Sequence, residues 1–302
     1  MSTLAGNVNV YRKDMVVGII GLGLIGGSMA VDLRRRGFAG EIIGVEAEPV
    51  NAAAALKMGL VDRIADLKEC VQESDVVIVA VPVGAATGLL PQVLDWFSVF
   101  AQRDGDCKKV VMDVCSTKEQ LALCVKEHPL RSRYVSTHPM AGTEYSGPWA
   151  AMAGLFDGHA CIICAAEDSA PDAVRMAEDI YDTLNMRVIY MEPSDHDVHA
   201  AYVSHISHIT SFALALTVLE KEKDEKHIFD LASGGFSSTV RLAKSSPDMW
   251  TPILSQNKDN VLHVMDTYIE KMQAFRQAIA EGNEAQVRDL IEEANRIRRI
   301  IR

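Results

Sequence analysis

The fold of the first half of this chain is decided by Val16-Val-Gly-Ile-Ile20 and the Gly21-Leu-Gly-Leu-Ile-Gly26 that follows it. The first run is apolar and mostly β-branched, which predicts a buried strand. The residues after the glycines predict a helix that ends at Gly37, because glycine is common just past the last helical residue. A strand, a tight glycine loop and a helix are therefore expected in direct succession.

Each glycine of this loop has its own role in a dinucleotide-binding unit. Gly21 permits the tight turn, Gly23 lets the backbone approach a pyrophosphate, and Gly26 allows the helix to pack closely on the strand. Leu24 and Ile25 open the helix, so their backbone lies at the positive end of the helix dipole. We expect these residues to bind a dinucleotide cofactor.

Glu46 indicates which dinucleotide is bound. It follows the second predicted strand, where an acid can bind the adenosine ribose hydroxyls. A carboxylate would repel a 2′-phosphate, and Ala47-Glu48-Pro49 offers no arginine, so the sequence favours NAD over NADP. Because ligands lie at the carboxyl ends of parallel strands, Val81-Pro82 and Asp113–Ser116 should border the nicotinamide.

Apolar runs alternate with helical stretches from Val16 to about Met191, which is typical of βαβ units. The further predicted strands are Glu41–Val45, Val76–Val81, Lys109–Val114, Tyr134–Thr137, Ala160–Ala165 and Arg187–Met191. After Pro193 the strand signals stop and helix predominates. We predict an N-terminal tail at 1–15, an α/β Rossmann domain with a doubly wound, mostly parallel sheet at 16–192, and an all-helical domain at 193–302.

The helical half is predicted to open on one long helix, from about Asp195 to Lys221. Ser194, with Asp197 three residues on, resembles a capping box at its start. This helix is apolar around most of its circumference, which indicates burial at the centre of a bundle or a dimer. The closing segment, Val287–Arg302, is predicted to be an amphipathic helix.

The composition is that of an ordinary globular protein, with 302 residues of which 48% are hydrophobic. The formal net charge of −11 argues against nucleic acid or an anionic membrane as a partner, since phosphates attract a basic surface. Neither a signal peptide nor a membrane span is expected, so the cytoplasm is the expected compartment. Cys161-Ile-Ile-Cys164 lies in a predicted strand, whose alternating faces separate the two thiols and argue against a zinc or redox role.

A candidate general base follows the strand Tyr134–Thr137. His138 opens the segment His138-Pro-Met-Ala-Gly-Thr-Glu144, and a neutral imidazole can accept the proton of an alcohol while hydride leaves. A histidine held by backbone hydrogen bonds in a turn is the structural alternative. Ser116 either orients this imidazole or caps a helix, and Lys118 either faces the substrate or is exposed.

The helical half contributes further candidates. Four histidines raise the question of a metal: His196, His199, His205 and His208. On a continuous helix His205 lies opposite His196, so one site cannot use all four, and no metal is expected. Arg241 follows a glycine pair and suits a bidentate grip on a carboxylate, although a surface arginine is an equal alternative.

Taken together, the segments of this chain resemble the prephenate dehydrogenase family. The segments are, in order, Gly21–Gly26, Asp113–Lys118, His138–Glu144, Ser204–His208 and Gly234–Trp250. The resemblance implies a Rossmann domain followed by a helical dimerisation domain, and hence a homodimer through the C-terminal helices. It also implies the NAD-dependent oxidative decarboxylation of prephenate to 4-hydroxyphenylpyruvate in tyrosine biosynthesis.

The resemblance further implies roles for individual residues. His138 would accept the proton of the ring hydroxyl while hydride passes to NAD, and Ser116 would orient His138 and the nicotinamide. Arg241 would hold a substrate carboxylate, His208 and Thr143 would line the substrate site, and Lys118 is grouped with these substrate-binding residues. The small-molecule substrate is then prephenate or its amino counterpart, arogenate.

This sequence departs from the family pattern in two places. Cys115-Ser-Thr-Lys118 replaces the usual Gly-Ser-Val-Lys and puts a reactive side chain beside the serine, and Ser237–Val240 is uncharged where many members carry charges. Two other classes stay open: a β-hydroxyacid dehydrogenase, for which no lysine stands out at Ser204–Thr210, and a non-enzymatic nucleotide sensor. A stand-alone catalytic form is expected.

Overall fold

The computed structural model describes residues 15–104, 107–223 and 227–300, so the predicted tail at 1–15 lies almost wholly outside the described residues. Within the described part, eight strands form one sheet in the order β3-β2-β1-β4-β5-β6-β7-β8. All neighbouring strands are parallel except β6 and β7. The strand order reverses between β1 and β4, which is where doubly wound sheets bind ligands at the carboxyl ends of their strands.

The predicted strands are all present, and the α/β fold class is confirmed. The strands are β1 Val16–Ile20, β2 Glu41–Val45, β3 Arg63–Ile64, β4 Val76–Val79, β5 Val110–Asp113, β6 Tyr134–Pro139, β7 Ala160–Cys164 and β8 Arg187–Met191. The prediction missed β3, because two residues are too few to produce an apolar pattern. β4 ends before the predicted Val81, which leaves Val81 and Pro82 in the loop that follows.

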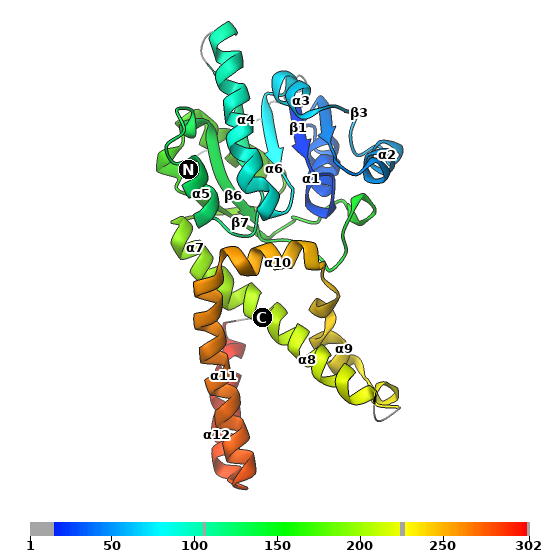
Figure 1. The fold of residues 1–302 in the computed structure, drawn as a ribbon, viewed down its shortest axis with the longest axis vertical. Coiled ribbons are helices and arrows are strands. Elements are labelled where there is room, and N and C mark those ends of the chain that lie inside the picture. Colours follow the sequence, from blue (N-terminus) through cyan, green and yellow to red (C-terminus); the bar gives the residue numbers. More distant parts are fainter. Residues whose placement is uncertain (1–14, 105–106, 224–226, 301–302) are drawn as a thin grey trace, which may run out of the picture.

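Helices cover both faces of this sheet (Figure 1). They are α1 Leu24–Arg35, α2 Pro49–Lys57, α3 Leu67–Glu73, α4 Val83–Asp104, α5 Glu119–Val125 and α6 Pro171–Thr183. Because strand residues alternate between faces, Val76 and Ile78 join the core formed with α1, α2 and α6. Val77 and Val79 join the opposite core, formed with α3, α4 and α5. The central strands are thus buried on both sides, as a parallel sheet requires.

The C-terminal half is helical among the described residues. Its helices are α7 Pro193–Ala200, α8 Ile206–Glu222, α9 Gly234–Thr239, α10 Pro247–Gln256, α11 Lys258–Ala280 and α12 Glu284–Ala294. A π-helical turn, Ala201–His205, joins α7 to α8 where one continuous α-helix was predicted. The predicted closing helix corresponds to α12 and the short 3₁₀ helix Asn295–Arg299; residues 301–302 lie outside the described residues.

Two helical arms project from the sheet domain, while α10 lies across the junction and packs against α4 (Figure 1). The long helix is not buried within the single chain, since Leu216 is 66% exposed, so its predicted burial in a dimer stays a prediction. The segment Pro193–Glu222 is also long and apolar enough to cross a membrane, but by length and composition only, a test that core helices of other proteins pass as well. A single chain therefore leaves a large apolar face uncovered.

Candidate active site

The glycine loop after β1 leaves open space next to Gly23. A Cβ atom on Gly23 would meet no heavy atom within 4 Å, whereas one on Gly26 would lie 2.1 Å from the carbonyl oxygen of Gly21. Gly21 has a φ of +95°, which favours glycine. The N-terminus of α1 has no side-chain cap, and Leu24 and Ile25 in its first turn are half-buried. The loop therefore fits an approaching pyrophosphate group.

Glu46 supports this loop from the end of β2. Its Oε2 atom accepts a hydrogen bond from the backbone N–H of Leu22 at 3.0 Å, and its Oε1 atom accepts one from that of Glu48 at 3.1 Å. The carboxylate thus lies at the glycine loop. Val81 is half-buried and Pro82 exposed in the loop after β4, at the same carboxyl edge of the sheet but across the switch point from Glu46. Ribose binding by Glu46 and nicotinamide contact by Val81 and Pro82 stay predictions.

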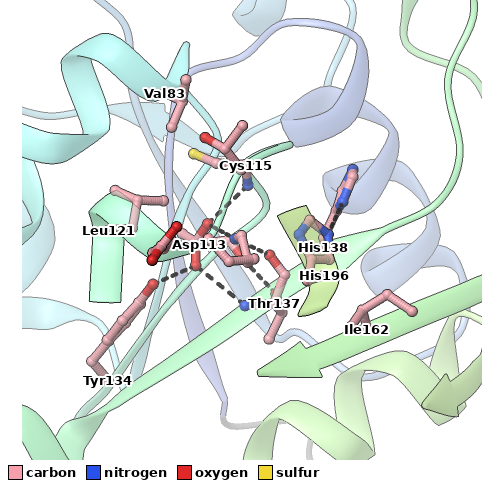
Figure 2. A network of polar contacts seen from close by, with 12 residues as sticks. Val83, Asp113, Cys115, Leu121, Tyr134, Thr137, His138, Ile162 and His196 are labelled. Atoms are coloured by element: carbon pink, nitrogen blue, oxygen red, sulfur yellow. Dashed lines mark hydrogen bonds and ion pairs between the residues drawn. The ribbon is translucent and has the colours of Figure 1, made fainter. Parts of the chain in front are cut away.

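Asp113, at the carboxyl end of β5, is the centre of a buried polar network (Figure 2). One carboxylate oxygen accepts from the Tyr134 hydroxyl at 2.7 Å, and the other accepts from the backbone N–H of Cys115 at 2.9 Å. The Nζ atom of Lys118 donates to the same Asp113 carboxylate and, at 2.6 Å, to the carbonyl oxygen of Thr137. The network joins the ends of β5 and β6 and reaches Thr137, the residue before His138.

Lys118 was assigned wrongly from the sequence. It is 0% exposed, so it neither contacts substrate nor lies at the surface. A buried carboxylate needs a cationic or hydrogen-bonding partner, and Lys118 forms an ion pair with Asp113. Burial alone would lower the pKa of Lys118, but the adjacent Asp113 raises it above its ordinary value. Lys118 therefore stays charged and holds the loop that carries Ser116.

His138 lies within β6, close to its carboxyl end, and is half-buried. Its Nδ1 atom is 2.8 Å from the Nε2 atom of His196 in α7, and the two rings meet edge to face (Figure 2). Burial, followed by the neighbouring His196 and Lys118, holds the pKa of His138 well below its usual range. The imidazole is consequently neutral at neutral pH and can accept a proton.

The loop beside His138 carries Ser116 and Cys115. Ser116 is half-buried and makes no hydrogen bond to His138 or to another described residue, whereas His196 contacts His138 directly; the role of Ser116 toward the nicotinamide stays a prediction. Cys115 was expected to be reactive, which was wrong. It is buried, and burial raises the pKa of its thiol well above the usual range, so the reactive thiolate is not available.

Arg241 lies across from the segment that His138 opens. Its Nη1 atom forms an ion pair with the Oε2 atom of Glu144 at 2.9 Å, and its side chain is 50% exposed. Thr143 is half-buried and accepts a hydrogen bond from the backbone N–H of Tyr145 at 3.3 Å. The structure thus brings the segment after β6 and the residues after α9 together.

His208, on α8, stacks on Trp250 of α10 with ring centroids 3.5 Å apart. Its Nδ1 atom also lies 3.1 Å from the carbonyl oxygen of Ser204, and burial lowers its pKa. His205 contacts the same Trp250 ring edge to face. These contacts fix both imidazoles against α10. Among the described residues, no group of three or more His, Cys, Asp or Glu side chains is arranged to hold a metal ion.

Sequence reasoning named His196, Asp197 and Glu144 but missed the contacts that these three residues make in this site. The capping box predicted at Ser194 is not formed, because α7 has no side-chain cap. Asp197 instead accepts from the backbone N–H groups of Lys118 and Glu119, at 2.8 and 3.0 Å, and so caps α5 of the other domain. A histidine next to an aspartate, as at His196 and Asp197, is a signal in the sequence for a polar site. The residues that they contact in the Rossmann half, however, lie 58 or more positions away.

The fold and the site together define a two-domain protein. A Rossmann-type nucleotide-binding half carries a neutral imidazole at its junction with a helical half. Comparison with protein families agrees with this class: the model "Prephenate dehydrogenase, nucleotide-binding domain" matches residues 29–190, and "Prephenate dehydrogenase, dimerization domain" matches residues 192–293. The chain belongs to the prephenate dehydrogenase family, which is a family of oxidoreductases.

Individual relatives agree with this assignment. The prephenate dehydrogenase of Bacillus subtilis is 32% identical over 266 residues, which cover 87% of this chain and 70% of the relative. The cyclohexadienyl dehydrogenase of Zymomonas mobilis is 29% identical, with 87% and 88% covered. A crystal structure of prephenate dehydrogenase from A. aeolicus, in complex with hydroxyphenyl propionate and NAD+, is 28% identical with a TM-score of 0.82, covering 95% of this chain and 98% of that one.

Proposed function

We propose that this chain catalyses the NAD-dependent oxidative decarboxylation of prephenate to 4-hydroxyphenylpyruvate, as a homodimer in the cytoplasm. The observation that carries the proposal is the neutral His138 imidazole, which lies at the carboxyl end of the sheet in a member of this family. A base that must remove a hydroxyl proton needs to be unprotonated at the working pH, and His138 meets this requirement.

NAD, when bound, accepts the hydride from the ring carbon that carries the hydroxyl group. His138 takes the hydroxyl proton as that carbon becomes a carbonyl. The bond between the ring and its carboxylate then breaks, carbon dioxide leaves, and the electron pair enters the ring, which becomes aromatic. The resulting phenolate takes the proton back from His138, so the residue is returned to its neutral form and no net proton is consumed.

The remaining predicted site residues have positioning tasks in this proposal. Gly21–Gly26 and Glu46 hold the dinucleotide, and the loop with Ser116 lies beside the nicotinamide. Arg241 exchanges its Glu144 partner for a substrate carboxylate, which accepts a planar guanidinium in the same geometry. His208 and Thr143 line the substrate pocket. The protein thus orients the ring and manages one proton.

Arogenate is the second candidate substrate. It carries an ammonium group where prephenate has a keto group, and the Glu144 carboxylate beside Arg241 offers a partner of opposite charge. The similarity of this chain to a relative named cyclohexadienyl dehydrogenase supports this candidate. The same general base serves either substrate, because the reacting ring is identical.

The homodimer is proposed from the dimerization-domain match and from the uncovered apolar face of α8. Leu216 and Leu219 are exposed in the single chain, and a second copy would bury them. Sizing of the purified protein tests this part of the proposal. A concentration-independent monomer would contradict it.

Activity is tested by adding NAD and either prephenate or arogenate to purified protein and following the absorbance of the reduced cofactor. Carbon dioxide release, measured in parallel, should equal cofactor reduction. We expect turnover with prephenate to exceed turnover with arogenate. The reverse order would make arogenate the substrate, and no turnover with either would overturn the proposal.

A further inference from the structure

A chain of hydrogen bonds connects His138 to the helical half. The Nδ1 atom of His138 is 2.8 Å from the Nε2 atom of His196, and the Nδ1 atom of His196 is 2.8 Å from the Oδ1 atom of Asp197. His196 and Asp197 are 3% and 2% exposed, so water does not compete for these contacts. Figure 2 shows the two imidazoles side by side at the edge of the Asp113 network.

Asp197, at the end of this series of hydrogen bonds, determines which histidine nitrogens carry protons. Its Oδ1 atom accepts from the backbone N–H of Lys118 at 2.8 Å, and its Oδ2 atom accepts from that of Glu119 at 3.0 Å. Backbone amides can only donate, so both oxygens act as acceptors. These amides also lie at the N-terminus of α5, where a carboxylate is stabilised by the helix dipole. Asp197 therefore acts as a hydrogen-bond acceptor, and it accepts from His196 as well.

The tautomers of both histidines follow from this arrangement. Since Asp197 can only accept, the Nδ1 atom of His196 carries its proton, and burial lowers the pKa of His196 so that the ring is neutral. The Nε2 atom of His196 then carries no proton and accepts a hydrogen bond from the Nδ1–H group of His138. The Nε2 atom of His138 is left unprotonated and has no partner among the described residues, as a general base requires.

We propose that His196 and Asp197 are positioning residues that hold His138 in its Nδ1–H tautomer, with the Nε2 atom free to take the substrate proton. This inference rests on the proposed function for its kinetic consequence, but not for its structural content. The base belongs to the Rossmann half, and the residues that orient it belong to α7 in the helical half. The contact between the two domains therefore determines the tautomer of His138. When His138 is protonated, the same contacts stabilise the imidazolium.

The kinetic test replaces His196 with phenylalanine, which keeps an aromatic ring at this position and removes both nitrogens. We expect kcat to fall about 100-fold, within the usual contribution of general base catalysis, while KM and NAD affinity change less than about threefold. His196→Gln, whose amide oxygen can accept from His138, should recover about tenfold of that loss. His199→Phe, at an exposed position of the same helix, is the matched control and should retain wild-type kcat.

A second measurement does not depend on activity. Imidazole nitrogen NMR of the wild-type protein, with the His138 signals assigned by their loss in His138→Asn, should show a proton on Nδ1 and none on Nε2. A proton on Nε2 of His138, or wild-type kcat in a folded His196→Phe variant, would overturn the proposal. If the wild-type protein turns over neither substrate, the proposed function fails, and the NMR spectrum alone decides the tautomer.

Discussion

The Nη1 atom of Arg241 lies 2.9 Å from the Oε2 atom of Glu144, and the two residues are 97 positions apart in the chain. This ion pair ties the segment after β6 to the helical half. Arg241 holds the Glu144 carboxylate, and in the proposed function a substrate carboxylate would replace this partner.

Arg241→Ala is expected to raise KM for prephenate about 10- to 100-fold, with a much smaller effect on kcat, because a lost charge-assisted hydrogen bond weakens binding by that order. Steady-state kinetics measures both constants. Lys244→Ala, which removes an exposed cation from the same segment, is the control and should leave KM within about threefold. An unchanged KM in the arginine variant would place Arg241 outside the substrate site.

Glu144→Gln removes the carboxylate that competes for Arg241. We expect KM for prephenate to stay level or fall, because the guanidinium becomes free for the substrate and a like charge is removed. For arogenate the same variant should raise KM, since the ammonium group loses its partner. A raised KM for prephenate would show that Glu144 contacts that substrate directly.

His138→Asn should lower kcat by about 10²- to 10⁴-fold, the usual contribution of a general base, while NAD binding measured by calorimetry stays unchanged. In the wild-type protein, kcat/KM should fall only as the pH drops well below 6.5, because burial holds the pKa of His138 below that value and only the neutral ring accepts a proton. The residual activity of His138→Asn should lack this acid limb. Near-normal turnover would remove His138 as the base.

Lys118→Met should destabilise the folded protein by about 3–5 kcal/mol, because it leaves the Asp113 carboxylate buried without its cation. Denaturant unfolding measures this change. Lys126→Met, at an exposed position just after α5, should stay within about 0.5 kcal/mol of wild type. Equal stability of the two variants would mean that Lys118 is not paired in solution.

His205 should make the folded protein sensitive to acid. Burial lowers its pKa to about 4, and its Nδ1 atom accepts a hydrogen bond from Asn257 that protonation would break. The unfolded chain binds this proton at higher pH, so the contribution of His205 is full above pH 6.5 and is lost as the pH falls toward 4. The melting temperature of His205→Asn should therefore depend less on pH across this window. For His263→Asn, at an exposed position, the melting temperature should vary with pH as it does in the wild type. The same wild-type pH dependence in His205→Asn would contradict the role given to His205.

Much of the fold could be predicted because local sequence patterns specify it. Strand β1, the glycine loop and α1 follow one another within 20 residues, and apolar runs bounded by turns marked the other long strands. The two-residue β3 and the π-helical turn at Ala201–His205 carry no such pattern, so both were missed. The long apolar helix was recognised, but its exposure in the single chain, with Leu216 at 66%, does not follow from the local pattern.

What the sequence by itself determined was the set of residue types with chemistry to offer: the glycine loop with Glu46, the imidazole of His138 and the guanidinium of Arg241. Only the tertiary structure decided which of them have partners. Lys118 is buried against Asp113, and His196 meets His138 across 58 positions. The physical reason is that periodicity and turn chemistry act over a few residues, whereas burial and hydrogen-bond partners are set when distant segments pack against each other.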